Sequence, residues 1–231
     1  MHAKTHTVDS VVAMLRRQAR PAELAGMARF GMATEGRLGL GIPALRALAK
    51  QLGRDHALAL QLWDTGIPDA QILAALVAEP ACFTSAQMDG WTKTMRSWDV
   101  CDQACNNAFG ASPLAWKKVG QWARRRDEFV RRSAFSLLAA LATHDKLAPD
   151  PRFVEALALI EAAADDERNF VKKAVNWALR GIGKRNAALN AAAIECAERL
   201  QQSGTRSARW IAADALRELQ GDAVKARLSR I

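Results

Sequence analysis

The chain contains no tyrosine, and aromatic residues make up only 6% of its 231 residues. Strands favour aromatic and β-branched residues, so a composition rich in alanine and leucine argues against a sheet protein. No stretch approaches the roughly 18 uninterrupted apolar residues that a membrane-spanning helix needs. The N-terminal sequence MHAKTHTVDSVV also lacks a long apolar run. We therefore expect neither a membrane partner nor a secretory signal.

Cysteine and histidine are scarce, with four of each. The cysteines show no spacing typical of a disulfide framework. Cys101 and Cys105 share a helix face with Ala104 and Ala108, which indicates small residues packed in a core. The histidines are scattered, and none lies at ligand spacing from a cysteine or glutamate. We therefore expect no metal site, no cofactor and a reduced, cytoplasmic protein.

Acidic residues are outnumbered, 24 against 33 basic ones, so the formal net charge is +9. Residues 121–231 hold 20 Lys and Arg against 14 Asp and Glu, and no acidic residue occurs from Asn169 to Ile194. This imbalance favours an anionic partner without requiring one.

Helical periodicity covers nearly the whole sequence and is interrupted at intervals by proline and glycine. It predicts roughly a dozen helices of about 10–18 residues with short connections. Three segments, Asp99–Gly110, Glu128–Leu141 and Glu167–Arg180, share a polar start, an aromatic residue and an Ala/Leu-rich tail. Their spacing of about 30–40 residues is typical of helical-repeat solenoids. We expect an all-α solenoid that forms one domain over residues 1–231, with a concave groove for an extended ligand.

One predicted helix carries two opposed rows of residues. The apolar row comprises Val171, Val175, Ala178 and Ile182, and the basic row comprises Lys173, Trp177, Arg180 and Lys184. Because a helix buries its apolar row, the basic row is expected to face away from the core. A cationic surface that carries a tryptophan suits nucleic acid. A solvated face whose tryptophan covers a neighbouring helix explains the same spacing equally well.

Two further helices place polar residues beside an apolar row. Trp98 and Asp102 lie four residues apart and share one face if a helix starts near Ser97. Arg132 lies two positions from Val130, and therefore opposite the core of its own helix, where it would suit a phosphate. A structural carboxylate and an ordinary solvated arginine are the alternatives.

The sequence resembles the AlkD-type alkylpurine DNA glycosylases, which are bacterial DNA alkylation repair proteins built of HEAT-like repeats. The matching segments are MARF at 27–30, LGLGIPALRALAK at 38–50, LALQLWD at 58–64, SWDVCD at 97–102, FVRRSAFSLL at 129–138 and RNFVKKAVNWALRGIGKRN at 168–186. The most specific part is WDxxD, followed by a helix with an arginine and then a helix with a tryptophan.

The resemblance implies a role for several residues. Asp102 matches the catalytic carboxylate, Trp98 and Trp177 match the tryptophans that flank the deoxyribose of the lesion, and Arg132 matches an arginine that contacts the DNA backbone. Phe30 occupies a position that is tyrosine in the family pattern, so the hydroxyl is missing. The sequence also departs from the pattern at Cys101 and at Asn169, where the pattern has an aromatic residue.

The resemblance further implies a monofunctional glycosylase that removes cationic alkylpurines, such as 3-methyladenine or 7-methylguanine, without deep base flipping. The partner would be double-stranded DNA with alkylated bases, bound by a monomer. The residues expected to contact it are Phe30, Arg132, Lys173, Arg180 and Lys184. Trp98, Asp102, Arg132 and Trp177 would then converge on one concave, positive face. Two alternatives remain open: a non-catalytic module that binds damaged or branched DNA, and a protein-binding helical scaffold. DNA binding with a steep salt dependence would count against the scaffold.

Overall fold

The computed structural model describes residues 6–230, and within this range every regular element is a helix. The described residues form two compact units, one ending at Pro113 and the other beginning at Leu114. Each unit is described by itself below, and the expectation of a single domain remains a prediction. Among the described residues, no helix is both long and apolar enough to cross a lipid bilayer.

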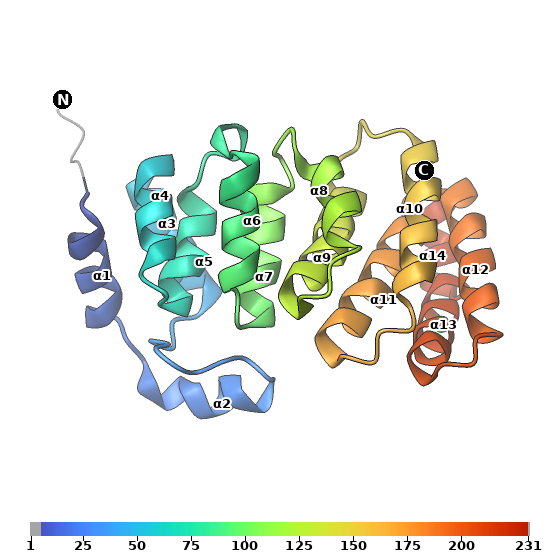
Figure 1. Cartoon of the computed structure of the whole chain (residues 1–231), viewed down its shortest axis with the longest axis horizontal. Coiled ribbons are helices and arrows are strands. Elements are labelled where there is room, and N and C mark those ends of the chain that lie inside the picture. The colour runs from blue at the N-terminus through green and yellow to red at the C-terminus, as the bar shows by residue number, and fades with distance from the viewer. Residues whose placement is uncertain (1–5, 231) are drawn as a thin grey trace. The chain divides into compact units, whose positions relative to one another are not determined.

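The N-terminal unit is built around α5 (Pro68–Val77), whose residues are almost all buried. Helices α3 (Ile42–Leu52), α4 (His56–Asp64) and α7 (Trp98–Ala104) pack against it (Figure 1). The remaining helical elements of this unit are α1 (Val8–Arg17), the 3₁₀ turns Pro21–Glu23 and Pro80–Cys82, α2 (Leu24–Arg29), α6 (Ser85–Thr94) and a π-helical turn, Cys105–Phe109, that continues α7.

Two tryptophans stabilise the core of this unit. The rings of Trp63 and Trp91 stack with their centroids 3.9 Å apart, and Phe83 packs edge-on against Trp91. The Trp63 indole nitrogen donates a hydrogen bond to the Thr94 hydroxyl at 2.9 Å. Trp63, part of the LALQLWD segment, is therefore a core residue.

The loop between α2 and α3 is held by a buried carboxylate. Asp69, at the start of α5, accepts hydrogen bonds from the amides of Leu38 at 2.7 Å and Leu40 at 2.8 Å. Gly39, between them, has a φ of +82°, and a Cβ atom there would lie 2.3 Å from the carbonyl oxygen of Arg20. Glycine is therefore required at this position by both the backbone conformation and the close approach.

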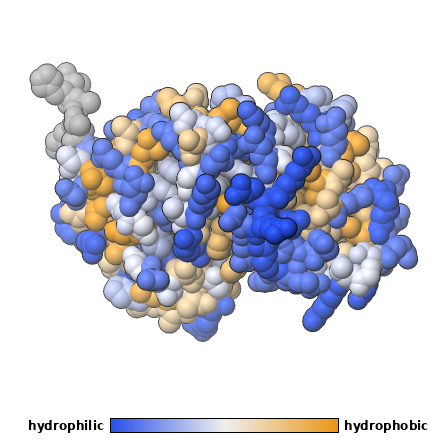
Figure 2. Space-filling model, in the orientation of Figure 1, coloured by the Kyte–Doolittle hydropathy of each residue, from blue (hydrophilic) through white to orange (hydrophobic). Residues whose placement is uncertain are grey.

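The C-terminal unit comprises α8 (Ala115–Trp122), α9 (Glu128–His144), α10 (Asp150–Ala163), α11 (Asn169–Gly183), α12 (Ala187–Gln201), α13 (Arg206–Leu219) and α14 (Asp222–Leu228). Helix α11 packs against α9 on one side and α13 on the other. Gly183 permits the second contact, because a Cβ atom there would lie 2.7 Å from the Leu219 side chain of α13. In the view of Figure 2, strongly hydrophilic surface lies over α8 and α9, which are joined by the exposed residues Arg124, Arg125 and Arg126.

The three segments predicted as repeats are helical, in α7 with its π-helical turn, in α9 and in α11. Both predicted core rows are confirmed: Cys101, Ala104, Cys105 and Ala108 are buried, as are Val171, Val175, Ala178 and Ile182. The expected helix lengths are wrong for α2, α7 and α14, which have only six or seven residues. In α7 the reason is the π-helical turn, which changes the hydrogen-bond spacing at Cys105.

Alanine at Gly39 should destabilise the protein more than alanine at Gly36. Both glycines have positive φ, but a Cβ atom at Gly36 would meet no atom within 4 Å. Gly36→Ala should cost about 1–2 kcal/mol, the penalty of a left-handed backbone. Gly39→Ala should cost about 2–5 kcal/mol, because the clash adds to that penalty. Urea denaturation of both variants tests this, and equal losses would contradict it.

Candidate nucleic-acid interface

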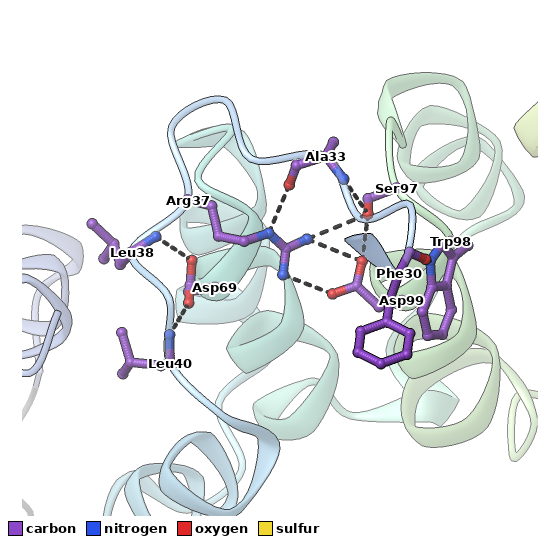
Figure 3. Close-up of polar contacts among 9 residues, drawn as sticks. All are labelled: Phe30, Ala33, Arg37, Leu38, Leu40, Asp69, Ser97, Trp98 and Asp99. Atoms are coloured by element: carbon purple, nitrogen blue, oxygen red, sulfur yellow. Dashed lines mark hydrogen bonds and ion pairs between the residues drawn. The ribbon is translucent and has the colours of Figure 1, made fainter. Parts of the chain in front are cut away.

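A buried ion pair fixes the start of α7. The Arg37 guanidinium donates to both carboxylate oxygens of Asp99, at 2.7 Å and 3.0 Å, and to the Ala33 carbonyl at 2.7 Å (Figure 3). The Ser97 hydroxyl donates to Asp99 and accepts a hydrogen bond from the Ala33 amide at 3.1 Å. Arg37, Ser97 and Asp99 are all buried, and we call them the Arg37 cluster. The cluster joins the loop after α2 to the first turn of α7.

Trp98 lies within the sequence that forms this cluster and is half-buried. Its indole Nε1–H donates a hydrogen bond of 3.0 Å to the carbonyl oxygen of Phe30. The Phe30 side chain is 77% exposed, which is unusual for an aromatic residue. Figure 3 shows the side chains of both residues at the start of α7, next to the Arg37 cluster. The structure thus brings together two of the predicted site residues that are far apart in the sequence.

Asp102 is half-buried and lies one turn after Trp98 in the same helix. The predicted helix start is confirmed, since Ser97 is the N-cap residue of α7. Its hydroxyl belongs to the Arg37 cluster, however, and does not cap the helix. Trp98 and Asp102 therefore share one face of a helix whose first turn is fixed by buried polar contacts.

The basic row lies on α11, opposite the buried row. Lys173 is exposed, and Trp177, Arg180 and Lys184 are half-buried. Lys173 has no ion pair within residues 6–230. The predicted orientation of this row is therefore confirmed, most clearly at Lys173.

Two acidic residues of α13 neutralise part of the basic row. Arg180 pairs with Glu218 at 2.6 Å and with Asp214 at 3.5 Å, and Lys184 pairs with Glu218 at 2.6 Å. Burial raises the pKa of Glu218, but Lys184 and Arg180 together lower it below its ordinary value. The stretch from Asn169 to Ile194 has no acidic residue of its own, but acidic residues of α13 pair with Arg180 and Lys184. Their contact with DNA remains a prediction.

The expectation that Arg132 faces away from the core of its helix is wrong. Arg132 is only 4% exposed, and every residue from Arg132 to Ala142 is buried, because neighbours including α8 and α11 pack on different sides of α9. One guanidinium nitrogen donates to the Phe170 carbonyl at 2.7 Å. The guanidinium carbon also lies 6.0 Å from the centre of the Phe170 ring. Arg132 thus joins α9 to α11, and its contact with DNA remains a prediction.

One exposed aromatic residue escaped the sequence interpretation. Trp210, on α13, is 40% exposed, and the Lys172 ammonium lies 5.2 Å from the centre of its ring. The two residues are 38 positions apart in the sequence. No spacing within one helix could reveal this contact.

The predicted site residues are divided between the two units. Phe30, Trp98 and Asp102 belong to the N-terminal unit, and Arg132, Lys173, Trp177, Arg180 and Lys184 belong to the C-terminal unit. Their convergence on one concave face would join the two units, and it remains a prediction.

A family model described as DNA alkylation repair enzyme matches residues 11–219. The chain belongs to this family. No curated protein sequence matches the chain. A solved structure described as "a new family of proteins related to the HEAT-like repeat DNA glycosylases with affinity for branched DNA structures" is similar with a TM-score of 0.78. The two sequences are 17% identical, and the match covers 96% of each chain.

A designed armadillo repeat protein also matches, with a TM-score of 0.42, 18% identity and coverage of 94% of this chain and 96% of that protein. The expected fold class, all-α with HEAT-like repeats, is confirmed by the family and by the first solved structure.

Removing the charge of Glu218 should strengthen DNA binding if the basic row faces DNA. Glu218→Gln removes the carboxylate that Arg180 and Lys184 share, and leaves Arg180 only its longer contact with Asp214. Affinity for an undamaged duplex should rise on the order of tenfold at low salt, and the log–log salt slope should become steeper by about 1 or 2. Glu161→Gln is the matched control, because Glu161 pairs with Arg199 on α12. Equal effects of the two variants would contradict this prediction.

Truncation of Asp99 should leave the buried charge of Arg37 without its partner. Asp99→Ala should lower the free energy of unfolding by about 3–5 kcal/mol, as expected for half of a buried ion pair. Glu161→Ala removes half of an exposed pair and should cost about 1 kcal/mol or less. Chemical denaturation measures both losses, and a loss for Asp99→Ala as small as the control would show that the cluster is dispensable.

Proposed function

We propose that the protein is a monofunctional DNA glycosylase that hydrolyses the N-glycosidic bond of cationic alkylpurines of the 3-methyladenine and 7-methylguanine type. Membership of the DNA alkylation repair enzyme family over residues 11–219 carries the proposal. The half-buried pair of Trp98 and Asp102, one helical turn apart on α7, supports it.

The chemistry needs few protein groups. An N-alkylated purine is already positively charged, so it leaves without a general acid. Positive charge then develops on the deoxyribose, where a carboxylate stabilises it and orients a water molecule. In this proposal Asp102 supplies the carboxylate, and Trp98 and Trp177 pack against the electron-poor sugar, with a cation–π contribution of about 0.5–2 kcal/mol each.

DNA would be held through its backbone and without extrusion of the base into a deep pocket. Of the cations in the basic row, Lys173 is the best placed for this role, because it is exposed and free of ion pairs within the described chain. Arg180 and Lys184 would contribute a smaller net charge, since Glu218 lies beside both. Phe30, with its exposed ring, would contact the DNA next to Trp98.

A second candidate is a non-catalytic module for branched DNA. The solved structure with a TM-score of 0.78 is described as belonging to proteins with affinity for branched DNA structures. Phe30 also replaces the tyrosine of the family pattern. This candidate retains the DNA-binding surface and assigns no chemistry to Asp102.

Substitution of Asp102 by asparagine separates the two candidates. The amide is isosteric, so Asp102→Asn should leave the fold and the affinity for DNA nearly intact. Release of 7-methylguanine should fall by on the order of 10²–10³, the usual effect of removing one preorganised electrostatic group. Single-turnover base release from a methylated duplex, alongside a binding titration, measures both quantities.

Asp9→Asn is the control, because Asp9 is an exposed carboxylate on α1 of the same unit. It should leave base release unchanged. If the wild-type protein releases no alkylated base, the glycosylase proposal fails and the module for branched DNA replaces it. If Asp102→Asn and the wild type release the base equally fast, the assignment of the carboxylate fails.

A further inference from the structure

Trp177 lines a groove of about 450 Å³ that lies entirely within the C-terminal unit. Its walls come from the last turns of α9 and α11, from the loop after α9 and from α14, which supplies Arg227. We call it the Trp177 groove. Its other charged lining residues are Lys146, Asp150, Lys184 and Arg185. Four cations therefore face one carboxylate in this groove.

Three of these charges already have partners. Asp150 accepts hydrogen bonds of 3.0 Å and 2.9 Å from the Asn186 amide, and Lys184 pairs with Glu218. Arg185 donates to the Ala142 carbonyl at 2.8 Å and, with a longer bond of 3.4 Å, to the Ala148 carbonyl. The bond to Ala142 places a cation at the negative C-terminal end of α9. These contacts explain why Asp150, Lys184 and Arg185 are present.

Lys146 and Arg227 are not explained in this way. Both are exposed, and neither forms an ion pair within residues 6–230. They come from different segments, the loop after α9 and the C-terminal helix, yet they line the same groove as Trp177. Two uncompensated cations beside an aromatic ring suit an anion that is attached to a flat or apolar group.

We propose that the Trp177 groove binds one phosphodiester of the DNA backbone, with Lys146 and Arg227 contacting the phosphate and Trp177 packing against the adjoining deoxyribose. The C-terminal helix α14 thereby takes part in DNA binding, a role that no sequence motif indicates. This inference rests on the DNA-binding part of the proposed function and does not depend on catalysis. A free nucleotide has the same phosphate chemistry, and the experiment distinguishes it from DNA.

The test compares two cations of the same short helix. Arg227 lines the groove, whereas Lys225 is also exposed on α14 but lies outside the lining. Arg227→Ala should weaken binding of an undamaged duplex about 3- to 10-fold and reduce the magnitude of the salt slope by about 1 at most. Lys146→Ala should have a similar effect. Lys225→Ala removes the same charge and should change affinity less than about twofold.

Arg227→Lys should restore most of the affinity, because it retains the charge. Thermal unfolding of each variant shows whether the fold is intact. Equal losses for Arg227→Ala and Lys225→Ala would overturn the proposal, since the effect would then come from net charge alone. An unchanged affinity in Arg227→Ala would overturn it as well.

A second measurement identifies the source of the phosphate. Deoxyadenosine monophosphate and inorganic phosphate are titrated while tryptophan fluorescence is followed in the wild type and in Trp177→Phe. If the ligand is the DNA backbone, duplex DNA should quench the fluorescence of Trp177 at a lower concentration than the mononucleotide does. Saturable, tight binding of the mononucleotide would instead assign the groove to a free nucleotide.

The outcome is independent of base release. If the wild type releases no alkylated base and Arg227→Ala still weakens duplex binding selectively, the groove remains and only the glycosylase proposal fails. If Asp102→Asn slows base release but Arg227→Ala and Lys225→Ala weaken duplex binding equally, the glycosylase proposal stands and the groove proposal fails.

Discussion

The buried ion pair between Arg37 and Asp99 is the constraint on which the N-terminal unit depends. It joins the loop after α2 to the first turn of α7, and so determines where Trp98 and Asp102 lie relative to Phe30. Two charges removed from water are stable only when their hydrogen-bonding groups are satisfied, and here Ser97 and the Ala33 carbonyl help to satisfy them. The buried carboxylate of Asp69 holds a later part of the same loop through the amides of Leu38 and Leu40.

The C-terminal unit relies on close helix packing, and its surface charge follows from that packing. Gly183 leaves room for the Leu219 side chain of α13, and the contact of α11 with α13 brings Glu218 against Arg180 and Lys184. Arg168 and Arg131 surround Asp166 in the same unit; burial alone would raise the pKa of Asp166, but the two arginines lower it below its ordinary value. Several cations of this unit are therefore paired with carboxylates. The unpaired cations, among them Lys173, Lys146 and Arg227, are the ones available to an external anion.

The chain belongs to the DNA alkylation repair enzyme family. This distribution of charge suits the glycosylase proposed above, whose cationic substrate would supply much of the chemical driving force. In that reaction a cationic leaving base would need little from the protein beyond a carboxylate, stacking surfaces and contacts to the DNA backbone. In the proposal α7 would supply the carboxylate, since its first turn is held by buried polar contacts while Trp98 and Asp102 remain half-exposed. In the proposal the Trp177 groove, within the C-terminal unit, would receive the DNA backbone.

The sequence by itself determined the helical class, the core rows of α7 and α11 and the sharing of one helix face by Trp98 and Asp102. These features follow from the 3.6-residue period, which is local and is written into consecutive residues. Tertiary structure alone decided that Arg132 is buried, that Glu218 neutralises two cations of α11 and that Arg227 lines the groove beside Trp177. Each of these depends on a neighbouring helix dozens of residues away. Helical spacing shows which residues share a face, but only packing between helices decides what that face contacts.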